Sequence, residues 1–395
     1  MEVSVRKGDT FSYYSSLLKI PINLIVDSNP KVNPQNLKLA SKIQLPGYMA
    51  IPYTVKEGDT YSRIAAFKEI AEDALHLINQ GNDENQLKPG DTLYVPEKLS
   101  VPIIMTNTPL DYKRLEKVIN RLKRVYPFIT VTTIGNSVLG NPLHEIRIGK
   151  GERKVHMNAS FHANEWITTM VLMRLVNQYL LSLIQVRGQM TAHLYEEVEL
   201  SIVPMVNPDG VDLVLNGPPS KLREDLVNIN EGSDDFIHWK ANIKGIDLNN
   251  QFPANWETCR NNKPYLAPAS RDFPGEAPLT EPEASAMAEL AKNNRFDCIF
   301  AFHTQGEEFY WGYEGNEPSE SELFAKEIER VSGYQAIRYV NSHAGYKDWF
   351  IQEFQRPGFT LELGKGINPL PLSQFPAILQ RAEAIFNTAL TFKFS

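Results

Sequence analysis

The chain has 395 residues, more than the roughly 100–200 of an ordinary domain, so two or three units are expected. Hydrophobic residues make up 42% and charged residues 22%, which is typical of a globular chain and argues against wholesale disorder. Because 40 Lys and Arg face 47 Asp and Glu, the net charge of −7 supplies no electrostatic drive for binding nucleic acid.

The N-terminus shows no targeting signal. Residues 1–6 contain no apolar stretch, so we expect no secretory signal and synthesis in the cytoplasm. The most apolar helical stretch, at 171–184, is interrupted by polar side chains, which argues against a membrane span. Two cysteines, Cys259 and Cys298, are too few for a disulfide framework or a cysteine-rich zinc site.

The first hundred residues contain an internal repeat. The segment at 5–10 recurs at 55–60, an offset of 50, and at the same offset Asn29 recurs as Asn79. Each copy predicts a short strand, a Gly-Asp turn with Thr as a helix N-cap, a helix, an asparagine-containing loop, a second helix, a turn and a second short strand. Units of about 45 residues are just large enough to form small βααβ modules.

The two copies resemble the LysM module, at residues 2–47 and 52–97. The second copy is a close match, whereas the first is degenerate, because Leu39-Ala40-Ser41 stands where a Pro-Gly turn belongs. The resemblance implies binding of glycans that contain N-acetylglucosamine, such as peptidoglycan. A module that serves only as a spacer or a dimerisation surface is the alternative.

A proline-containing stretch at 98–109 is predicted to be a linker, and residues 110–395 are predicted to form a large α/β domain. Because the strand at 299–302 is apolar throughout, we expect a mixed, largely parallel sheet that is flanked by helices and buried on both faces. Ligands bind at the carboxyl ends of such strands. Apolar spacing and strand-like runs predict strands at 143–148, 155–160, 197–204 and 298–303, and helices at 111–126 and near 165–183 and 281–293.

Potential metal ligands follow two of these strands. His162 and Glu165 come directly after one strand, and His303 ends another. Two imidazoles and one carboxylate leave a fourth zinc position open, which is typical of a catalytic rather than a structural site. The pattern His-x-x-Glu is common by itself, so a buried histidine bonded to a backbone carbonyl and a glutamate favoured by a helix dipole are the alternative.

Residues 110–395 resemble the zinc carboxypeptidases through an ordered set of motifs. The resemblance implies one zinc ion held by His162, Glu165 and His303. It also implies that Glu362 is the catalytic base, which takes a proton from the attacking water and passes it to the leaving amine. A structural salt bridge is the alternative for Glu362. Besides the metal ligands, the motifs are Tyr126-Pro127, residues 134–137, Asn207-Pro208-Asp209-Gly210, Gly245-Ile246-Asp247-Leu248-Asn249, Phe302-His303 and Thr360-Leu361-Glu362-Leu363-Gly364.

Two departures from the family pattern affect charged groups. Asn249 matches a residue that helps to bind the substrate's terminal carboxylate, but Asn250 replaces the arginine that clamps it. A neutral amide cannot form a charge-assisted fork, which argues against action on ordinary C-termini. Lys240 replaces the arginine that stabilises the oxyanion and still offers a positive charge, unless it is a solvated surface lysine.

Lys347 carries a further clue to specificity. In the family, the residue at this position lies at the base of the pocket for the residue after the scissile bond. A lysine there favours an acidic group in the substrate, and a lysine that reaches solvent is the alternative. Family tyrosines also contribute near this segment, and Tyr339 and Tyr346 both remain candidates.

The glycan-binding modules and the altered site point to one polymer. Peptidoglycan stem peptides contain meso-diaminopimelate, which has a second carboxylate and is linked to γ-D-glutamate. The whole chain is similar to the γ-D-glutamyl-L-diamino acid endopeptidases of sporulating bacilli, which implies hydrolysis of that bond with the modules raising the local substrate concentration. A conventional zinc carboxypeptidase, a cytoplasmic muropeptide-recycling amidase and an inactive glycan-binding protein are the alternatives. Oligomeric state, the preference for diaminopimelate over lysine, and association with a spore or cell wall stay open.

Overall fold

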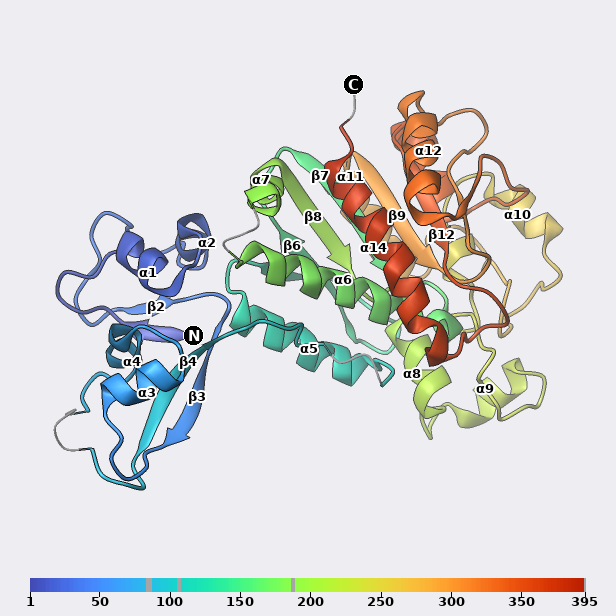
Figure 1. Ribbon diagram of the computed structural model, residues 1–395. Coiled ribbons are helices and arrows are strands. Elements are labelled where there is room, and N and C mark those ends of the chain that lie inside the picture. The colour runs from blue at the N-terminus through green and yellow to red at the C-terminus, as the bar shows by residue number, and fades with distance from the viewer. Residues whose placement is uncertain (83–86, 105–107, 186–188, 394–395) are drawn as a thin grey trace. The chain divides into compact units, whose positions relative to one another are not determined.

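The computed structural model describes residues 1–82, 87–104, 108–185 and 189–393 (Figure 1). Contacts divide the chain into two units. The first comprises Met1–Ile103, Val118–Thr130 and Asn177–His193, and the second comprises Ile104–Lys117, Val131–Val176 and Leu194–Ser395. In the part of the chain that the structure describes, no helix has the length and apolar character needed to cross a membrane.

Two βααβ modules make up most of the first unit. The first contains β1 (Glu2–Ser4), α1 (Phe11–Leu18), α2 (Ile22–Asp27) and β2 (Lys42–Gln44), and the second contains β3 (Tyr48–Thr54), α3 (Tyr61–Phe67), α4 (Glu72–Ile78) and β4 (Thr92–Lys98). The strands of each module pair antiparallel. Thr10 and Thr60 cap α1 and α3, as predicted, because each hydroxyl accepts a hydrogen bond from the backbone three residues on. Residues 83–86 of the second predicted module lie outside the described residues.

The repeated asparagine follows the second helix of each module, so its predicted place between the two helices is wrong. The first module's helices have only eight and six residues, and both end before Asn29. The Asn29 side chain donates to the carbonyl of Gln44 and accepts from its amide. Asn79 makes the same pair of bonds to Tyr94. Each asparagine therefore ties the end of the second helix to the last strand.

The two modules are packed against each other. Arg6 of the first module forms two hydrogen bonds, of 2.9 and 2.7 Å, with the carboxylate of Asp73 in α4. Ala74 and Leu77, also in α4, belong to the buried cluster of the first module. A bidentate Arg–Asp pair fixes orientation as well as distance. The modules therefore form one packed pair.

Part of the predicted linker at 98–109 is buried. Ile103 and Ile104 are 9% and 2% exposed, and the amide of Ile103 donates to Oδ1 of Asn177 over 2.7 Å. Residues 105–107 lie outside the described residues. The boundaries at 2–47, 52–97 and 110–395 stay predictions.

An eight-stranded sheet forms the centre of the second unit, in the order β11-β10-β12-β9-β7-β8-β6-β5. The inner strands β12, β9, β7 and β8 are parallel, whereas β10 and β6 run antiparallel to the inner strands that they adjoin. The predicted mixed, largely parallel sheet is confirmed. The strands are β5 (Thr130–Asn136), β6 (Pro142–Ile148), β7 (Arg153–Ala159), β8 (Val198–Val203), β9 (Cys298–His303), β10 (Glu308–Tyr310), β11 (Gln335–Ile337) and β12 (Gly358–Glu362).

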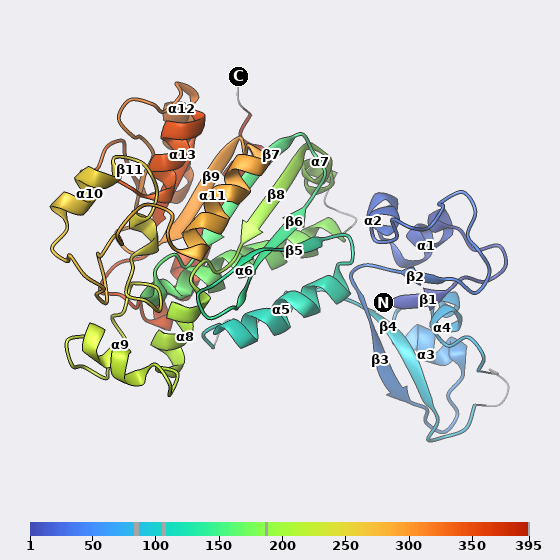
Figure 2. The same ribbon diagram turned by 180° about the vertical axis from the view of Figure 1, so that it is seen from behind.

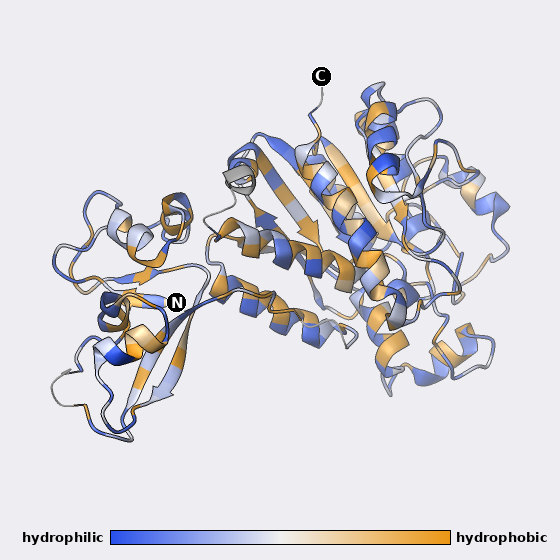
Figure 3. Cartoon of the chain, viewed as in Figure 1, coloured by the Kyte–Doolittle hydropathy of each residue, from blue (hydrophilic) through white to orange (hydrophobic). Residues whose placement is uncertain are grey.

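Helices cover both faces of this sheet. The helices α6 (Ile167–Leu183) and α14 (Phe375–Thr391) lie on one face (Figure 1), and α11 (Pro282–Asn294) lies on the other (Figure 2). All six residues of β9 are buried, and Figure 3 shows the strongly hydrophobic colour of this strand. The other helices are α5 (Tyr112–Val125), α7 (Gln189–Glu197), α8 (Pro208–Asn216), α9 (Arg223–Ile229), α10 (Trp256–Asn262), α12 (Glu320–Ser332) and α13 (Tyr346–Phe354).

Candidate active site

Three buried side chains meet at the carboxyl ends of parallel strands. His162 follows β7, His303 ends β9, and Glu165 lies in a short 3₁₀ turn that leads into α6. Nδ1 of His162 is 2.9 Å from one carboxylate oxygen of Glu165, and Nδ1 of His303 is 3.0 Å from the other. One ligand atom from each residue lies within 4.8 Å of the others, so the group could hold a metal ion.

A tight turn after β7 places His162. Ser160 has a left-handed backbone conformation, with φ 51°, which turns the chain out of the strand. Its amide donates to the Thr168 hydroxyl and its own hydroxyl lies 2.8 Å from that of Thr169, both in α6. Asn207, from one of the sequence motifs, donates to the carbonyl of Phe161 over 3.2 Å. Local polar contacts therefore hold the turn between strand and helix.

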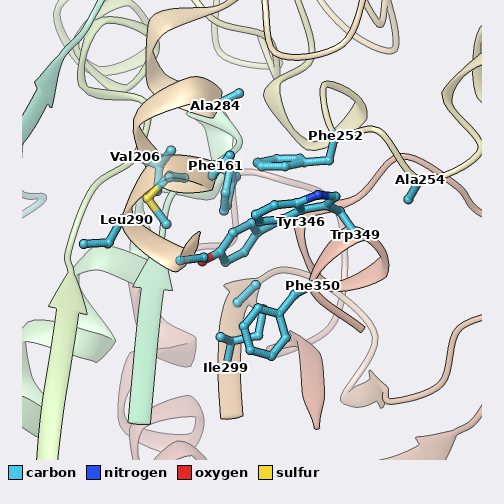
Figure 4. Packing of buried hydrophobic residues seen from close by; sticks show 14 of the residues in the cluster. Phe161, Val206, Phe252, Ala254, Ala284, Leu290, Ile299, Tyr346, Trp349 and Phe350 are labelled. Carbon is cyan, nitrogen blue, oxygen red and sulfur yellow. The ribbon is translucent and has the colours of Figure 1, made fainter. Parts of the chain in front are cut away.

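Aromatic packing against one face of the ring supports His303. The ring of Phe161 stacks on the His303 imidazole with centroids 6.0 Å apart and an interplanar angle of 10°. Phe161 belongs to a buried cluster that includes Phe252 and Tyr346 (Figure 4). Because interiors are close-packed, this cluster restricts the orientation of the imidazole.

Asp247 holds the second nitrogen of His162. Its Oδ1 lies 3.2 Å from Nε2 of His162, and its Oδ2 lies 2.9 Å from Nζ of Lys240. Burial opposes ionisation of Asp247, but the charges of Lys240 and His162 hold its pKa well below the ordinary value. A carboxylate that accepts the Nε2–H fixes the tautomer and leaves Nδ1 as a metal ligand. Sequence reasoning placed Asp247 in a motif but gave it no role.

Glu362 stands beside the cluster. It ends β12, where it is paired in register with His303. Burial, reinforced by the negative charge of Glu165, raises the pKa of Glu362 to about 8. A raised pKa makes the carboxylate a stronger base, which favours its accepting a proton.

A cavity of about 550 Å³ opens over these residues. Its lining includes His162, Glu165, Glu362 and Lys240, which the sequence predicted, and also Asn164, Arg271 and Tyr310, which it did not; His303 is not part of the described lining. Tyr310 lies on β10, a strand of only three residues, and Arg271 lies in a segment without regular structure. Neither has a periodic pattern around it that sequence analysis could detect.

The asparagines predicted to bind substrate lie elsewhere. Among the described residues, neither Asn249 nor Asn250 is part of the cavity lining. Oδ1 of Asn249 accepts from the amide of Tyr346 over 3.0 Å. Asn250 is buried, with its Oδ1 3.6 Å from Sγ of Cys259. Their role in binding substrate stays a prediction.

Lys347 and the two candidate tyrosines also lie outside the described cavity lining. Lys347 is 4% exposed, with Nζ 2.6 Å from Oδ1 of Asp348 and 2.8 Å from the carbonyl oxygen of Gly312. Tyr346 is fully buried, and the exposed Tyr339 donates its hydroxyl hydrogen to a glutamate. The substrate roles predicted for these residues are not tested by this arrangement.

Two families match the sequence. Residues 115–383 match the zinc carboxypeptidase family, and residues 53–96 match the LysM domain. The chain is 48% identical to Gamma-D-glutamyl-L-diamino acid endopeptidase 1 of Lysinibacillus sphaericus, over 99% of this chain and 100% of that protein. It is 43% identical to the protein YqgT of Bacillus subtilis, over 95% of this chain and 94% of that protein.

The fold is similar to that of a solved carboxypeptidase. The structure of carboxypeptidase A from Helicoverpa armigera superposes with a TM-score of 0.55 and 18% sequence identity. The similarity covers 87% of this chain and 98% of that one. At this level of identity the match concerns the fold alone.

Replacing Asp247 by Ala is expected to weaken zinc binding roughly 10–100-fold, because His162 loses the group that orients it. Asp272→Ala is the matched control, since Asp272 also pairs with Lys240, at 3.3 Å, but makes no hydrogen bond or ion pair with His162 or His303 among the described residues. Competition with a chromophoric chelator measures both affinities. Equal zinc affinity in Asp247→Ala and the unchanged chain would contradict this role.

Proposed function

The chain belongs to the zinc carboxypeptidase family, and we propose that it hydrolyses the γ-D-glutamyl bond to the diamino acid, meso-diaminopimelate, in peptidoglycan stem peptides. The observation that carries this proposal is the 48% identity, over nearly both full lengths, to an endopeptidase named for that bond. The neutral Asn250 supports it, because an ordinary carboxypeptidase needs a cation for the terminal carboxylate.

We infer that His162, Glu165 and His303 hold one zinc ion. The donor set fits this metal, because both Nδ1 atoms and the carboxylate converge in a buried site and Asp247 orients one imidazole. When bound, zinc supplies a Lewis acid that polarises the scissile carbonyl and lowers the pKa of water towards roughly 7.

Glu362 and Lys240 carry the remaining steps of the proposed mechanism. Glu362 takes a proton from the attacking water and returns it to the leaving amine, a role that its place in the cavity lining beside His162 and Glu165 supports. Lys240 lies between Asp247 and Asp272 and keeps its positive charge at the cavity. There it stabilises the negative charge that develops on the carbonyl oxygen.

The N-terminal modules are proposed to bind the glycan strand. The match at residues 53–96 supports this for the second module. For the first module, at 2–47, the support is the shared βααβ order and the equivalent bonds of Asn29 and Asn79. Two linked weak sites raise the effective concentration of stem peptide at the catalytic cavity.

Digestion of purified peptidoglycan tests the proposed reaction. Mass spectrometry of the products is expected to show a new free amino group on diaminopimelate and a new free γ-carboxyl group on D-glutamate. Glu362→Gln should yield none of these ends above background. Release of single C-terminal amino acids instead would indicate a conventional carboxypeptidase and contradict the proposal.

Glu362→Gln is expected to keep its zinc and its fold but to lower kcat by roughly 10²–10⁴-fold, because the amide cannot accept the proton of water. Glu353→Gln, which changes an exposed glutamate of α13 in the same way, is the control and should retain full activity. Turnover of a soluble γ-D-glutamyl-diaminopimelate peptide measures both. Activity of Glu362→Gln within a few-fold of the unchanged chain would mean that another group activates water.

Glycan binding can be separated from catalysis in the full-length Glu362→Gln variant. Bound to insoluble peptidoglycan, it is expected to be released by soluble N-acetylglucosamine oligomers, which compete for the modules. Glucose oligomers of equal length should release none, because they lack the acetamido groups. Retention of the protein at saturating N-acetylglucosamine oligomer would speak against a glycan site.

A further inference from the structure

The cavity contains one permanently charged side chain that the proposed mechanism does not use. Arg271 lines the cavity together with His162 and Glu362, and its side chain is 53% exposed. Its Nε donates to Oδ2 of Asp272 over 2.8 Å, and its guanidinium makes no other hydrogen bond to the described residues. Because the guanidinium is a planar fork of five N–H donors, both terminal nitrogens remain available for a carboxylate.

The backbone fixes this arginine relative to the catalytic residues. The carbonyl of Ser270 accepts hydrogen bonds from the amides of Lys240, at 2.8 Å, and Ala241, at 3.0 Å. The carbonyl of Phe273 accepts from the amide of Asp247 over 2.8 Å. The segment at 270–273 is therefore bound at both ends to the segment that carries Lys240 and Asp247. Arg271 is thus held at the cavity by the same backbone that positions the catalytic charges.

Three cations surround the carboxylate of Asp272, beside the cavity. Its carboxylate faces Arg271 at 2.8 Å, Lys240 at 3.3 Å and Lys263 at 3.6 Å. Burial opposes ionisation of Asp272, but the charge of Lys240 above all holds its pKa below the ordinary value. Lys240 also contacts the carboxylate of Asp247, at 2.9 Å. Lys240 is paired with both carboxylates. Arg271 therefore is the cation of the cavity lining whose N–H groups remain available to a ligand.

The two positions that the sequence analysis favoured for recognising a carboxylate do not supply an unpaired cation. Asn250 carries no charge, and the ammonium of Lys347 already contacts Asp348 and a backbone carbonyl. Among the described residues of the cavity lining, Arg271 is the only arginine. Planar, bidentate recognition of a carboxylate at this cavity therefore falls to Arg271.

We propose that Arg271 binds a substrate carboxylate beside the scissile bond and thereby determines specificity; this rests on the proposed function. Two carboxylates of the stem peptide fit. A γ-linkage leaves the α-carboxylate of D-glutamate free, and meso-diaminopimelate has a carboxylate at its second centre. Neither changes charge during hydrolysis, so the contact is equally strong in the ground and transition states and acts on KM rather than kcat.

Three soluble peptides, each with its C-terminal carboxylate amidated, separate these sources: L-Ala-γ-D-Glu-meso-diaminopimelate, the same peptide with the glutamate α-carboxylate amidated as well, and the same peptide with the second diaminopimelate carboxylate amidated as well. In full-length protein, Arg271→Gln is expected to raise KM for the parent peptide roughly 10–150-fold with little change in kcat. The effect should vanish for the one peptide that lacks the bound carboxylate, which identifies that carboxylate.

Lys263→Gln is the matched control. It removes another cation beside Asp272, but Lys263 is not part of the described cavity lining, so KM should stay within a few-fold for all three peptides. Arg271→Lys should recover only part of the affinity, because an ammonium cannot form the planar fork. Stoichiometric zinc in every variant shows that the site has folded.

Two results would overturn the assignment of Arg271. One is an equal rise in KM for all three peptides in Arg271→Gln, and the other is a rise in KM no larger in Arg271→Gln than in Lys263→Gln. A KM in Arg271→Lys equal to that of the unchanged chain would contradict bidentate binding by the guanidinium. If the unchanged chain cleaves the peptides but Arg271→Gln has no effect, only this inference fails. If the unchanged chain cleaves none of them, the proposed function fails, and the role of Arg271 fails with it.

Discussion

Parallel pairing of β7, β9 and β12 is the constraint on which the rest of the site depends. The register places Ala159 beside Phe302 and Glu362 beside His303, so three strands end at one edge of the sheet. His303, 141 residues downstream of His162, is thereby brought to within 3.1 Å of it, and Glu362 comes to line the same cavity as His162. Backbone ladders inside a buried sheet set these positions more firmly than side-chain contacts could.

A continuous line of buried charge extends from this edge. Glu165 contacts His162, His162 contacts Asp247, and Asp247 contacts Lys240, all through distances of 2.9–3.2 Å. Burying isolated charges is costly, whereas a chain in which each charge has an opposite neighbour is tolerated. Lys240 extends the line to Asp272, and Asp272 to Arg271. The proposed catalytic and recognition groups are therefore parts of one electrostatic network.

The sequence predicted the parts of the fold that have regular patterns. The apolar β9 and the amphipathic α5 lie close to their expected limits. Asn29 and Asn79 were predicted between the two helices of each module but follow the second helix. The prediction failed because packing, rather than periodicity, sets where such short helices end. The contacts of Lys347 could not be predicted, because its ammonium donates to the carbonyl oxygen of Gly312, 35 residues earlier, as well as pairing with the adjacent Asp348. Arg271 was missed since its position depends on hydrogen bonds to a segment 30 residues earlier.

The neutral Asn250 and the charged Arg271 together account for the kind of bond that the proposal assigns. An arginine that clamps a terminal carboxylate restricts an enzyme to chain ends, because internal residues have no such group. A γ-linked glutamate carries a free α-carboxylate wherever it lies in a chain. On this proposal, moving the recognised charge from the chain end to an internal carboxylate releases the substrate from having to end at the site. On the same proposal, the zinc cluster and the base cut a stem peptide that is still attached to its glycan, which is the form of substrate that the proposed glycan-binding modules would deliver.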